Sequence, residues 1–302
     1  MGPGIRPMHP FHRTELLVGG EGHDRLVASS ACVIGLGGVG SYAAEALARS
    51  GIGRLVFVDF DKVCITNVNR QLHATRRTVR QFKADLMVER AAQINPKADV
   101  VGMRTFYEPE TAEAILGEGY DIVLDCIDNM TAKVHLLQTC IERDQPVISA
   151  MGAGGRMDPT RLRVTDIAET RKDPFARIVR QLLRERGITE GVTCVWSDEP
   201  PHDLDQAAES SFRCICPDKS LKDKHSCEGR HQVQGTVPWM PAMFGLTMAG
   251  VAVHQILDRP IAERPRQVRL KPTAKPSRAE KQRLLRQAGY GREEIDGGPN
   301  AR

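Results

Sequence analysis

Four glycines in one short segment could bring the protein backbone against a phosphate group. The segment reads Gly35-Leu36-Gly37-Gly38-Val39-Gly40, and it follows an apolar run, residues 31–34. Glycine permits a tight turn, and a helix that starts just beyond it offers unpaired N–H groups and a positive dipole end to an anion. Asp59 stands about 20 residues further on, where a carboxylate can accept hydrogen bonds from ribose hydroxyls. This spacing is typical of a nucleotide-binding site.

The residues after Asp59 carry more charge and more amide groups than a dinucleotide cofactor needs. They include, in chain order, Asp61, Asn67, Arg70, Gln71 and Lys83. A dehydrogenase holds its pyrophosphate at the glycine turn, which leaves Arg70 and Lys83 without a role. A site that splits a triphosphate needs such cations, because negative charge develops on the leaving pyrophosphate. The set therefore indicates ATP and favours phosphate chemistry over hydride transfer.

A second group of polar residues follows another expected strand, whose apolar residues are 122–124. Asp125 ends the run, and Asp128 and Asn129 come shortly after it. In a parallel sheet the carboxyl ends of the strands form the ligand crevice, so we expect these side chains to face the nucleotide. Magnesium is usually held by one or two carboxylates together with substrate phosphates. Asp128 is therefore the predicted magnesium ligand.

A parallel sheet is needed to bring these residues together, and the rest of the chain predicts one. Strands are expected at residues 31–34, 55–58, 100–105, 121–125 and 146–150, and helices at 41–50, 79–94, 109–116 and 130–143. This alternation is typical of a Rossmann-like, doubly wound α/β sheet with helices on both faces. Strands near 162–165 and 192–196, with a helix at 174–186, predict an antiparallel extension of this mainly parallel sheet.

These motifs together resemble those of the ubiquitin-activating-enzyme superfamily, which includes the ThiF-type adenylating enzymes of thiamine and molybdopterin synthesis. The resemblance rests on the glycine segment, Asp59-Phe60-Asp61, Asn67-Val68-Asn69-Arg70-Gln71, Lys83 and Asp128-Asn129. Within the superfamily the chain is most similar to the bacterial tRNA threonylcarbamoyladenosine dehydratases. The segments that carry this similarity are residues 11–17, 63–71 and 151–160, which begin at Phe11, Val63 and Met151. The resemblance covers roughly residues 11–258.

The resemblance implies an enzyme that uses ATP and Mg²⁺. The four glycines, Asp59, Asp61, Asn67, Gln71 and Asn129 would bind the nucleotide, and Arg70, Lys83 and Asp128 would bind it and act in catalysis. A substrate carboxylate attacks the α-phosphorus, pyrophosphate leaves and an acyl-adenylate forms. In the dehydratases that carboxylate belongs to threonylcarbamoyladenosine, beside the anticodon of tRNA. A neighbouring atom of the same group then closes a ring and releases AMP, and because it is already tethered no protein nucleophile is required.

Members of the superfamily also bring an arginine from the leading helix of one subunit to the nucleotide of the other. Arg13 matches that arginine, in a helix expected over residues 11–26 with a turn at 19–22, so the resemblance implies a catalytic Arg13 and a homodimer. A solvated Arg13 is the alternative. A second activity also stays open: adenylation of the C-terminus of a ubiquitin-like sulfur-carrier protein, with a cysteine desulfurase or a sulfur-acceptor protein as partner. Sulfur-carrier activators hold zinc with two Cys-x-x-Cys pairs, and this sequence has neither.

Seven of the eight cysteines fall into two groups. Cys32, Cys64, Cys126 and Cys140 lie in apolar or strand-end contexts and are expected to be buried free thiols. Cys214, Cys216 and Cys227 lie in a long polar segment, residues 197–234, beside His225 and His231. Metal binding, a nucleophilic role for Cys227 and an inert loop are the three interpretations, of which the inert loop is favoured.

Charge is concentrated near the C-terminus. The net charge is +4, whereas residues 264–302 contain eleven Lys or Arg and four Asp or Glu. We therefore expect a disordered N-terminus at residues 1–10, an adenylating domain at 11–262 and a disordered basic tail at 263–302 with weak affinity for RNA. Arg177, Arg180 and Arg184 share one face of a predicted helix, either as a contact for the phosphate backbone or as a solvated face.

The composition is that of an ordinary soluble protein, with 41% hydrophobic and 26% charged residues. No stretch reaches the roughly 18 uninterrupted apolar residues of a membrane span. The nearest, residues 241–257, is broken by polar residues and glycines and is expected to be a buried helix. The N-terminus lacks the apolar core of a signal peptide, and free thiols suit a reducing compartment, so a cytoplasmic protein without membrane contact is expected.

Overall fold

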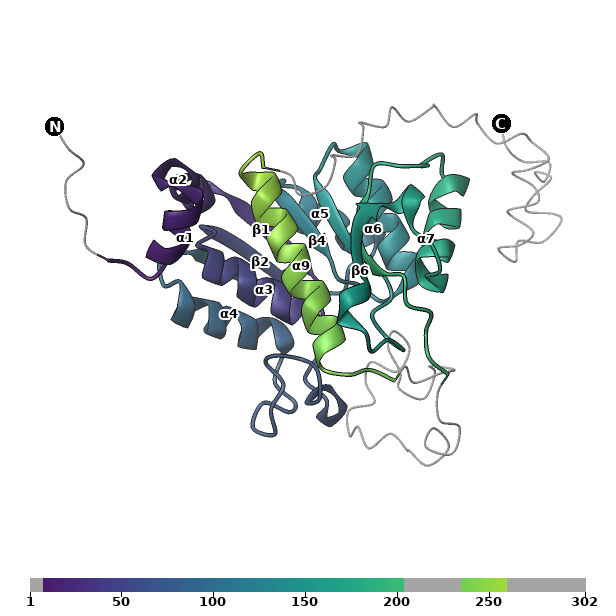
Figure 1. Cartoon of the computed structure of the whole chain (residues 1–302). Helices are drawn as coiled ribbons and strands as arrows, with labels where there is room; N and C mark the ends of the chain where they lie inside the picture. The colour runs from purple at the N-terminus through teal and green to yellow at the C-terminus, as the bar shows by residue number, and fades with distance from the viewer. Residues whose placement is uncertain (1–7, 204–234, 260–302) are drawn as a thin grey trace, which may run out of the picture. The chain divides into compact units, whose positions relative to one another are not determined.

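A seven-stranded sheet forms the centre of the part of the chain that the computed structural model describes, residues 8–203 and 235–259 (Figure 1). The strands are β1 (Ser30–Ile34), β2 (Arg54–Val58), β3 (Asp99–Met103), β4 (Ile122–Asp125), β5 (Val147–Ala150), β6 (Leu162–Asp166) and β7 (Thr193–Ser197), in the order β3-β2-β1-β4-β5-β7-β6. Neighbouring strands are parallel except β6 and β7, which are antiparallel. The predicted mainly parallel α/β sheet with an antiparallel extension is confirmed.

Helices cover both faces of this sheet. On one face, α3 (Gly40–Ser50) packs against α4 (Lys83–Ile94) and against α9 (Trp239–Ile256). On the other face, α6 (Met130–Glu142) packs against β4 and β5 and contacts α5 (Pro109–Leu116) and α7 (Pro174–Glu185). In Figure 1, α3 and α9 lie in front of the strands, and α5 and α6 lie behind them. The strand order and the two helical layers are those of a doubly wound fold.

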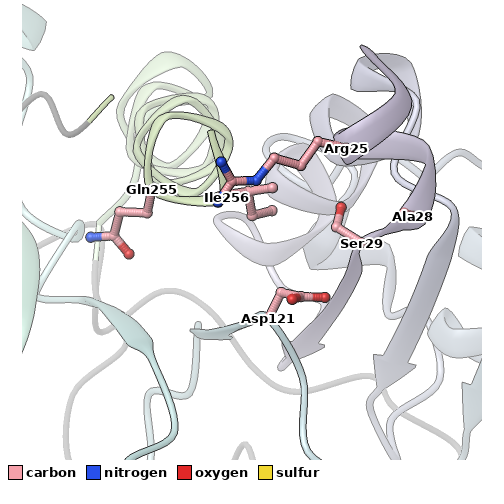
Figure 2. A pocket seen from close by; sticks show the side chains of 6 residues that line it. All are labelled: Arg25, Ala28, Ser29, Asp121, Gln255 and Ile256. Atoms are coloured by element: carbon pink, nitrogen blue, oxygen red, sulfur yellow. The ribbon is translucent and has the colours of Figure 1, made fainter. Parts of the chain in front are cut away.

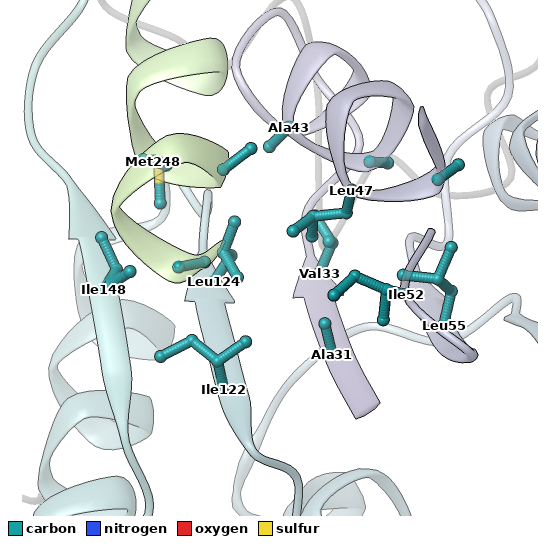
Figure 3. Close-up of a cluster of buried hydrophobic side chains, with 14 of the residues drawn as sticks. Ala31, Val33, Ala43, Leu47, Ile52, Leu55, Ile122, Leu124, Ile148 and Met248 are labelled. Atoms are coloured by element: carbon teal, nitrogen blue, oxygen red, sulfur yellow. The ribbon is translucent and has the colours of Figure 1, made fainter. Parts of the chain in front are cut away.

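Apolar side chains of the central strands and of α3 and α9 form the main core. Figure 3 shows Val33 of β1 and Leu124 of β4 pointing toward Leu47 of α3 and Met248 of α9, all fully buried. Strands β1 and β4 are buried along almost their whole length, as expected of central parallel strands. One side of α9 packs on the sheet and on α3, whereas Trp239, Met243 and Leu246 of the same helix are exposed.

Helix α9 approaches the glycine segment unusually closely. A Cβ atom built on Gly245 would lie 2.2 Å from the carbonyl oxygen of Val39 and 2.9 Å from the backbone nitrogen of Ala43. A Cβ atom on Gly38 would lie 2.9 Å from Cβ of Pro241. The first half of α9 therefore supports the turn from which α3 begins, and glycine permits that approach.

This contact gives a prediction about stability. Gly245→Ala should lower the free energy of unfolding by about 1–3 kcal/mol, because the new methyl group must displace backbone atoms of α3. Gly250→Ala in the same helix is the matched control: its Cβ would meet nothing within 4 Å, so the gain in helix propensity, up to about 1 kcal/mol, should remain. Urea denaturation measures both. Equal stabilities of the two variants would contradict the close packing of α9 on α3.

Two predicted helices begin or break elsewhere than expected. Helix α4 starts at Lys83 instead of residue 79, because the chain turns through residues 75–80, where Arg80 adopts φ 74°, and is extended at Phe82. The leading segment forms two helices, α1 (His12–Val18) and α2 (Gly20–Ala28). The break is at Gly19, with φ 83°, and not over residues 19–22. The apolar run at 241–257 forms the helix predicted there, α9, but the helix is buried on one side only.

Several predictions concern residues outside the described ranges. These are most of the N-terminal ten residues, the tail at 263–302, and Cys214, Cys216, Cys227, His225 and His231. Among the described cysteines, Cys32, Cys140 and Cys194 are buried, Cys64 and Cys126 are half-buried, and all five are free thiols. Of the helices in the described ranges, none is sufficiently long and apolar to cross a membrane.

Candidate active site

The glycine turn is packed so tightly that two of its positions require glycine. Gly35 has φ 90°, and a Cβ there would lie 2.9 Å from the carbonyl oxygen of Cys126. A Cβ on Gly40 would lie 1.8 Å from the carbonyl oxygen of Gly35. The backbone N–H of Gly35 donates to the carbonyl of Val58 at 2.8 Å. The turn is thus held between the carboxyl ends of β1, β2 and β4, where a doubly wound sheet binds its ligand.

Asp59 lies at the end of β2 and is joined to this turn by hydrogen bonds. Its Oδ2 accepts the backbone N–H of Leu36 at 2.7 Å, and its Oδ1 accepts that of Asp61 at 2.8 Å. The side chain is only 8% exposed. Burial raises the pKa of Asp59, and the positive charge of Lys83 opposes that rise. Each carboxylate oxygen keeps a second lone pair, so Asp59 can still accept hydrogen bonds from ribose hydroxyls.

Lys83, the first residue of α4, is the buried cation of the site. Its Nζ donates to Oδ2 of Asp61 at 2.9 Å and lies 4.0 Å from Oδ2 of Asp59. Burial alone would lower the pKa of Lys83, but the charges of Asp59 and Asp61 outweigh it, so the pKa is raised. The charge of the exposed Asp128 contributes to the same rise. Lys83 is therefore a fixed positive charge among three carboxylates from the ends of two strands.

Arg70 and Gln71 lie over the glycine turn. A Cβ on Gly38 would lie 3.4 Å from Cγ of Arg70, and one on Gly37 would lie 3.9 Å from Nε2 of Gln71. The guanidinium of Arg70 donates to the carbonyl of Thr66 at 2.8 Å, which holds the side chain near the turn. The structure thus brings together the glycines, Asp59, Asp61, Arg70, Gln71 and Lys83. Their roles toward a nucleotide stay a prediction.

The two predicted asparagines use their side chains within their own loops. Oδ1 of Asn67, in the 3₁₀ helix η1 (Ile65–Asn67), accepts the backbone N–H of Cys64 at 2.9 Å. Oδ1 of Asn129 caps α6 by accepting the backbone N–H of Ala132 at 3.0 Å. Both side chains shape the loops that carry Arg70 and Asp128.

The buried ion pair of Lys133 and Asp125, close in sequence to Asp128, was not predicted from the sequence. Nζ of Lys133, which is fully buried, lies 2.5 Å from Oδ2 of Asp125, and it also donates to the carbonyl of Ala150 at 3.0 Å. The hydroxyl of Ser149 donates to the same Asp125 oxygen at 2.6 Å. This network joins the ends of β4 and β5, from which the Asp128 loop departs. A lysine inside the apolar face of a predicted helix was the signal that could have revealed it.

A second buried ion pair organises the segment at residues 151–155. Arg156 and Asp173 are 2% and 3% exposed, and Nη2 of Arg156 lies 3.1 Å from Oδ2 of Asp173. The Arg156 guanidinium also donates to the carbonyls of Gly152 and Gly154. Asp173 in turn caps α7 by accepting the backbone N–H groups of Phe175 and Ala176. The segment that follows β5 is therefore held rigidly at the carboxyl edge of the sheet.

His73 was also missed. It is 5% exposed, and neither ring nitrogen has a hydrogen-bond partner among the described residues. Burial lowers the pKa of His73 to about 3, and the charges of Lys83 and Arg90 act in the same direction. The imidazole is neutral at physiological pH and adds no further charge beside Lys83.

Arg13 is not at the nucleotide site of its own chain. It is exposed on α1, whose neighbours Phe11 and His23 pack against Gly51, just after the C-terminus of α3. The glycine turn is at the other end of α3, an 11-residue helix about 16 Å long. An intrachain role for Arg13 in binding the triphosphate is thus ruled out by position.

The arginine face of α7 is smaller than predicted. Arg177 and Arg184 are exposed, but Nη1 of Arg180 donates to the carbonyl of Thr170 at 2.7 Å and holds the end of η3 (Ile167–Glu169). Two of the three arginines are therefore available to a partner.

One surface hollow lies away from this site (Figure 2). Its volume is about 310 Å³, and Arg25, Ser29, Asp121 and Ile256 are among its lining residues. Ser29 precedes β1 and Asp121 precedes β4, so the hollow is at the amino ends of the strands. The glycine turn and Asp59 are at the carboxyl ends, and the hollow has no part in nucleotide binding.

Comparison with known proteins agrees with the geometry. The model of the ThiF family matches residues 11–287. The chain is 51% identical over 250 residues to the tRNA threonylcarbamoyladenosine dehydratase of Bacillus subtilis, covering 83% of this chain and 95% of that protein. It is similar in structure to the tRNA N6-threonylcarbamoyladenosine dehydratase of Escherichia coli in complex with ATP, with a TM-score of 0.70, 33% identity and coverage of 83% and 94%.

An adenylyltransferase of a sulfur-carrier protein is similar over a shorter range. The sulfur carrier protein ThiS adenylyltransferase of Escherichia coli is 33% identical over 139 residues, or 45% of this chain and 55% of that protein. These similarities confirm the superfamily and the branch that the sequence motifs predicted. Since the family model spans nearly all of the described residues, the chain belongs to the ThiF family.

Proposed function

We propose that this chain is an ATP-dependent dehydratase that closes a ring in threonylcarbamoyladenosine of tRNA, through an acyl-adenylate. The observation that carries the proposal is the joining of the glycine turn, Asp59, Arg70 and Lys83 at one sheet edge. The same fold in the Escherichia coli tRNA N6-threonylcarbamoyladenosine dehydratase binds ATP, and that relative covers nearly the whole described chain.

ATP lies with its ribose on Asp59 and its phosphates over the glycine turn. The positive end of α3 and the backbone N–H groups of the turn favour the phosphate charge. Arg70 lies beside Gly38 of the turn, and Lys83 lies beside Asp59 and Asp61. They stabilise the charge that develops when the α-phosphorus is attacked and pyrophosphate leaves.

Magnesium fits the carboxylates of this edge. Asp128 is exposed, is near enough to Lys83 to raise its pKa, and offers the oxygen ligands that Mg²⁺ prefers. Asp61, half-buried and paired with Lys83, is a second group with carboxylate oxygens. Asp128 would hold the ion, which supplies positive charge to the phosphates. The chain's own residues keep Asp128 in place through the cap of α6 and the Lys133–Asp125 pair.

Ring closure needs no cysteine of the described chain. Burial raises the pKa of Cys126, the described thiol nearest the glycine turn, above its usual value, which suppresses the thiolate. The substrate carries its own attacking group next to the activated carbonyl, so its effective concentration is high. This feature favours cyclisation over transfer to a protein thiol.

A homodimer would complete the site. Arg13 is exposed on α1 and distant from the nucleotide of its own chain, and Leu16 and Leu17 on the same helix are 73% and 84% exposed. Apolar residues presented in this way favour an interface that carries Arg13 to the other subunit's phosphates. The substrate tRNA would place the protein in the cytoplasm, with Arg177 and Arg184 available to its backbone.

Adenylation of a sulfur-carrier protein is the second candidate, with a cysteine desulfurase or sulfur-acceptor protein as partner. The nucleotide site would serve this activity equally well. The similarity to the ThiS adenylyltransferase covers less of the chain than the similarity to the dehydratase, so it supports this activity less.

Pyrophosphate release separates the two activities. Assayed with ATP and Mg²⁺, it should be stimulated by tRNA carrying threonylcarbamoyladenosine and not by the same tRNA lacking that modification. Mass spectrometry of the modified tRNA should show the loss of one water. Stimulation by a carrier protein with a free C-terminus, and none by modified tRNA, would replace the dehydratase by the second candidate.

A further inference from the structure

Three side chains at the start of the described chain form a cluster outside the active site: His9, His12 and Glu15. Nε2 of His9 lies 2.7 Å from Oε2 of Glu15, and Nδ1 of His12 lies 3.8 Å from the same oxygen. One nitrogen of each histidine and one carboxylate oxygen all lie within 4.8 Å of one another. The three residues are half-buried, so the cluster is neither a solvated surface group nor a sealed core.

We propose that this cluster, here called the leader cluster, binds a divalent transition metal with the preferences of zinc. Bonds of about 2.1 Å in a tetrahedral arrangement place two ligand atoms roughly 3.4 Å apart. The observed separations of 2.7 and 3.8 Å lie on either side of that value, so small side-chain rotations suffice. Two imidazoles and one carboxylate also form a ligand set found in zinc sites, and leave a fourth position for water.

The leader cluster comes from the first turn of α1 and from His9, three residues before that helix begins. His12 and Glu15 are three apart on α1 and therefore share a face. His9 folds back over them, and its ring is stacked on that of His23 in α2, with the ring centroids 4.8 Å apart. Nδ1 of His23 is buried and has no hydrogen-bond partner in the part of the chain described. Side chains of α1 and of the segment before it thus form the cluster, and His23 of α2 packs against it.

Metal binding changes the tautomer of His9 without releasing a proton. Without metal, the neutral ring of His9 can donate from Nε2 to Glu15 and accept the backbone N–H of Phe11 at Nδ1, 3.3 Å away. With metal on Nε2, the ring proton moves to Nδ1, and this long contact is given up. The change costs the His9–Glu15 hydrogen bond and the long contact to Phe11, and gains three coordinate bonds.

The ligand chemistry separates this site from the magnesium site. Imidazole ligands favour zinc-like ions, whereas the carboxylates around Asp128 favour Mg²⁺. The leader cluster also lies near Gly51, at the opposite end of α3 from the glycine turn. The inference therefore does not rest on the proposed function.

Metal binding by the leader cluster can be tested by titration with cobalt(II). The titration uses the tag-free, full-length, chelator-stripped chain in excess Mg²⁺. A tetrahedral nitrogen- and oxygen-ligated ion gives visible absorption bands, which stoichiometric Zn²⁺ should abolish. Cysteine ligation instead gives an intense sulfur-to-cobalt band in the near ultraviolet, so binding by Cys214, Cys216 or Cys227 is recognised separately. His12→Ala and Glu15→Gln should each weaken the nitrogen- and oxygen-ligated signal by at least about tenfold in affinity.

Glu21→Gln is the matched control, since Glu21 is exposed in the first turn of α2 and outside the leader cluster. It should leave the titration unchanged. His9→Gln alters a ligand outside α1 and keeps the test valid if His12→Ala loosens that helix, which circular dichroism of the metal-free chain will show. A cobalt signal that survives in His12→Ala, Glu15→Gln and His9→Gln, or one that is wholly sulfur-ligated, overturns the proposal.

Discussion

Lys83→Ala should lower kcat by about 10²–10³-fold while changing the dissociation constant of ATP much less. The reason is that Lys83 is a fixed cation beside the phosphates, so it acts most strongly on charge that develops as pyrophosphate leaves. Removing it also leaves Asp59 and Asp61 without their counter-ion, so melting temperatures of both proteins must accompany the kinetics. Single-turnover formation of AMP with modified tRNA is the measurement.

Lys97→Ala is the control for Lys83→Ala, because Lys97 is exposed just beyond the C-terminus of α4. It should behave like the unaltered enzyme. If Lys83→Ala raised only the Michaelis constant for ATP and left kcat unchanged, Lys83 would be a binding residue without a role in the transition state.

Lys133→Met should lower the free energy of unfolding by about 3–5 kcal/mol, because it leaves the buried carboxylate of Asp125 without a counter-charge. Methionine keeps most of the volume of the lysine stem, so loss of packing contributes little. Denaturant unfolding followed by circular dichroism measures the effect.

The double variant Lys133→Met with Asp125→Asn supplies the control. It replaces the unpaired carboxylate of Asp125 by a neutral amide, whose oxygen can still accept the hydrogen bond from Ser149. It should therefore be more stable than Lys133→Met alone. Strict additivity of the two single changes would show that Lys133 and Asp125 do not interact energetically.

Local patterns were sufficient for the sheet and for half of the site. The apolar runs at β1, β2 and β4 and the glycines between them determine a βαβ unit through contacts close in sequence, and the spacing to Asp59 follows from it. Lys83 was identified as a cation of the site, although α4 begins four residues later than expected. The error arose because Arg80 adopts a left-handed conformation that a helical pattern does not reveal.

The groups that escaped prediction depend on contacts between distant elements. Lys133 meets Asp125 and Ser149 only because β4 and β5 are neighbours in the sheet, and Arg156 meets Asp173 only because α7 returns to the strand edge. The leader cluster needs His9 to fold back onto α1 and meet the ring of His23. Periodicity and composition contain no information about such long-range contacts. A charged residue inside an apolar helix face, however, indicates a buried ion pair.

The close packing of Gly245 on α3 has a consequence for how the protein is made. The glycine turn, Asp59 and Lys83 are all synthesised in the first third of the chain, but the helix that supports the turn, α9, is among the last described elements to leave the ribosome. Until residues 239–256 emerge, the apolar faces of α3, β4 and β5 that α9 covers stay exposed. A nascent or truncated chain therefore contains every nucleotide-binding residue and still lacks a finished nucleotide site, so ATP should protect only the completed protein against proteolysis.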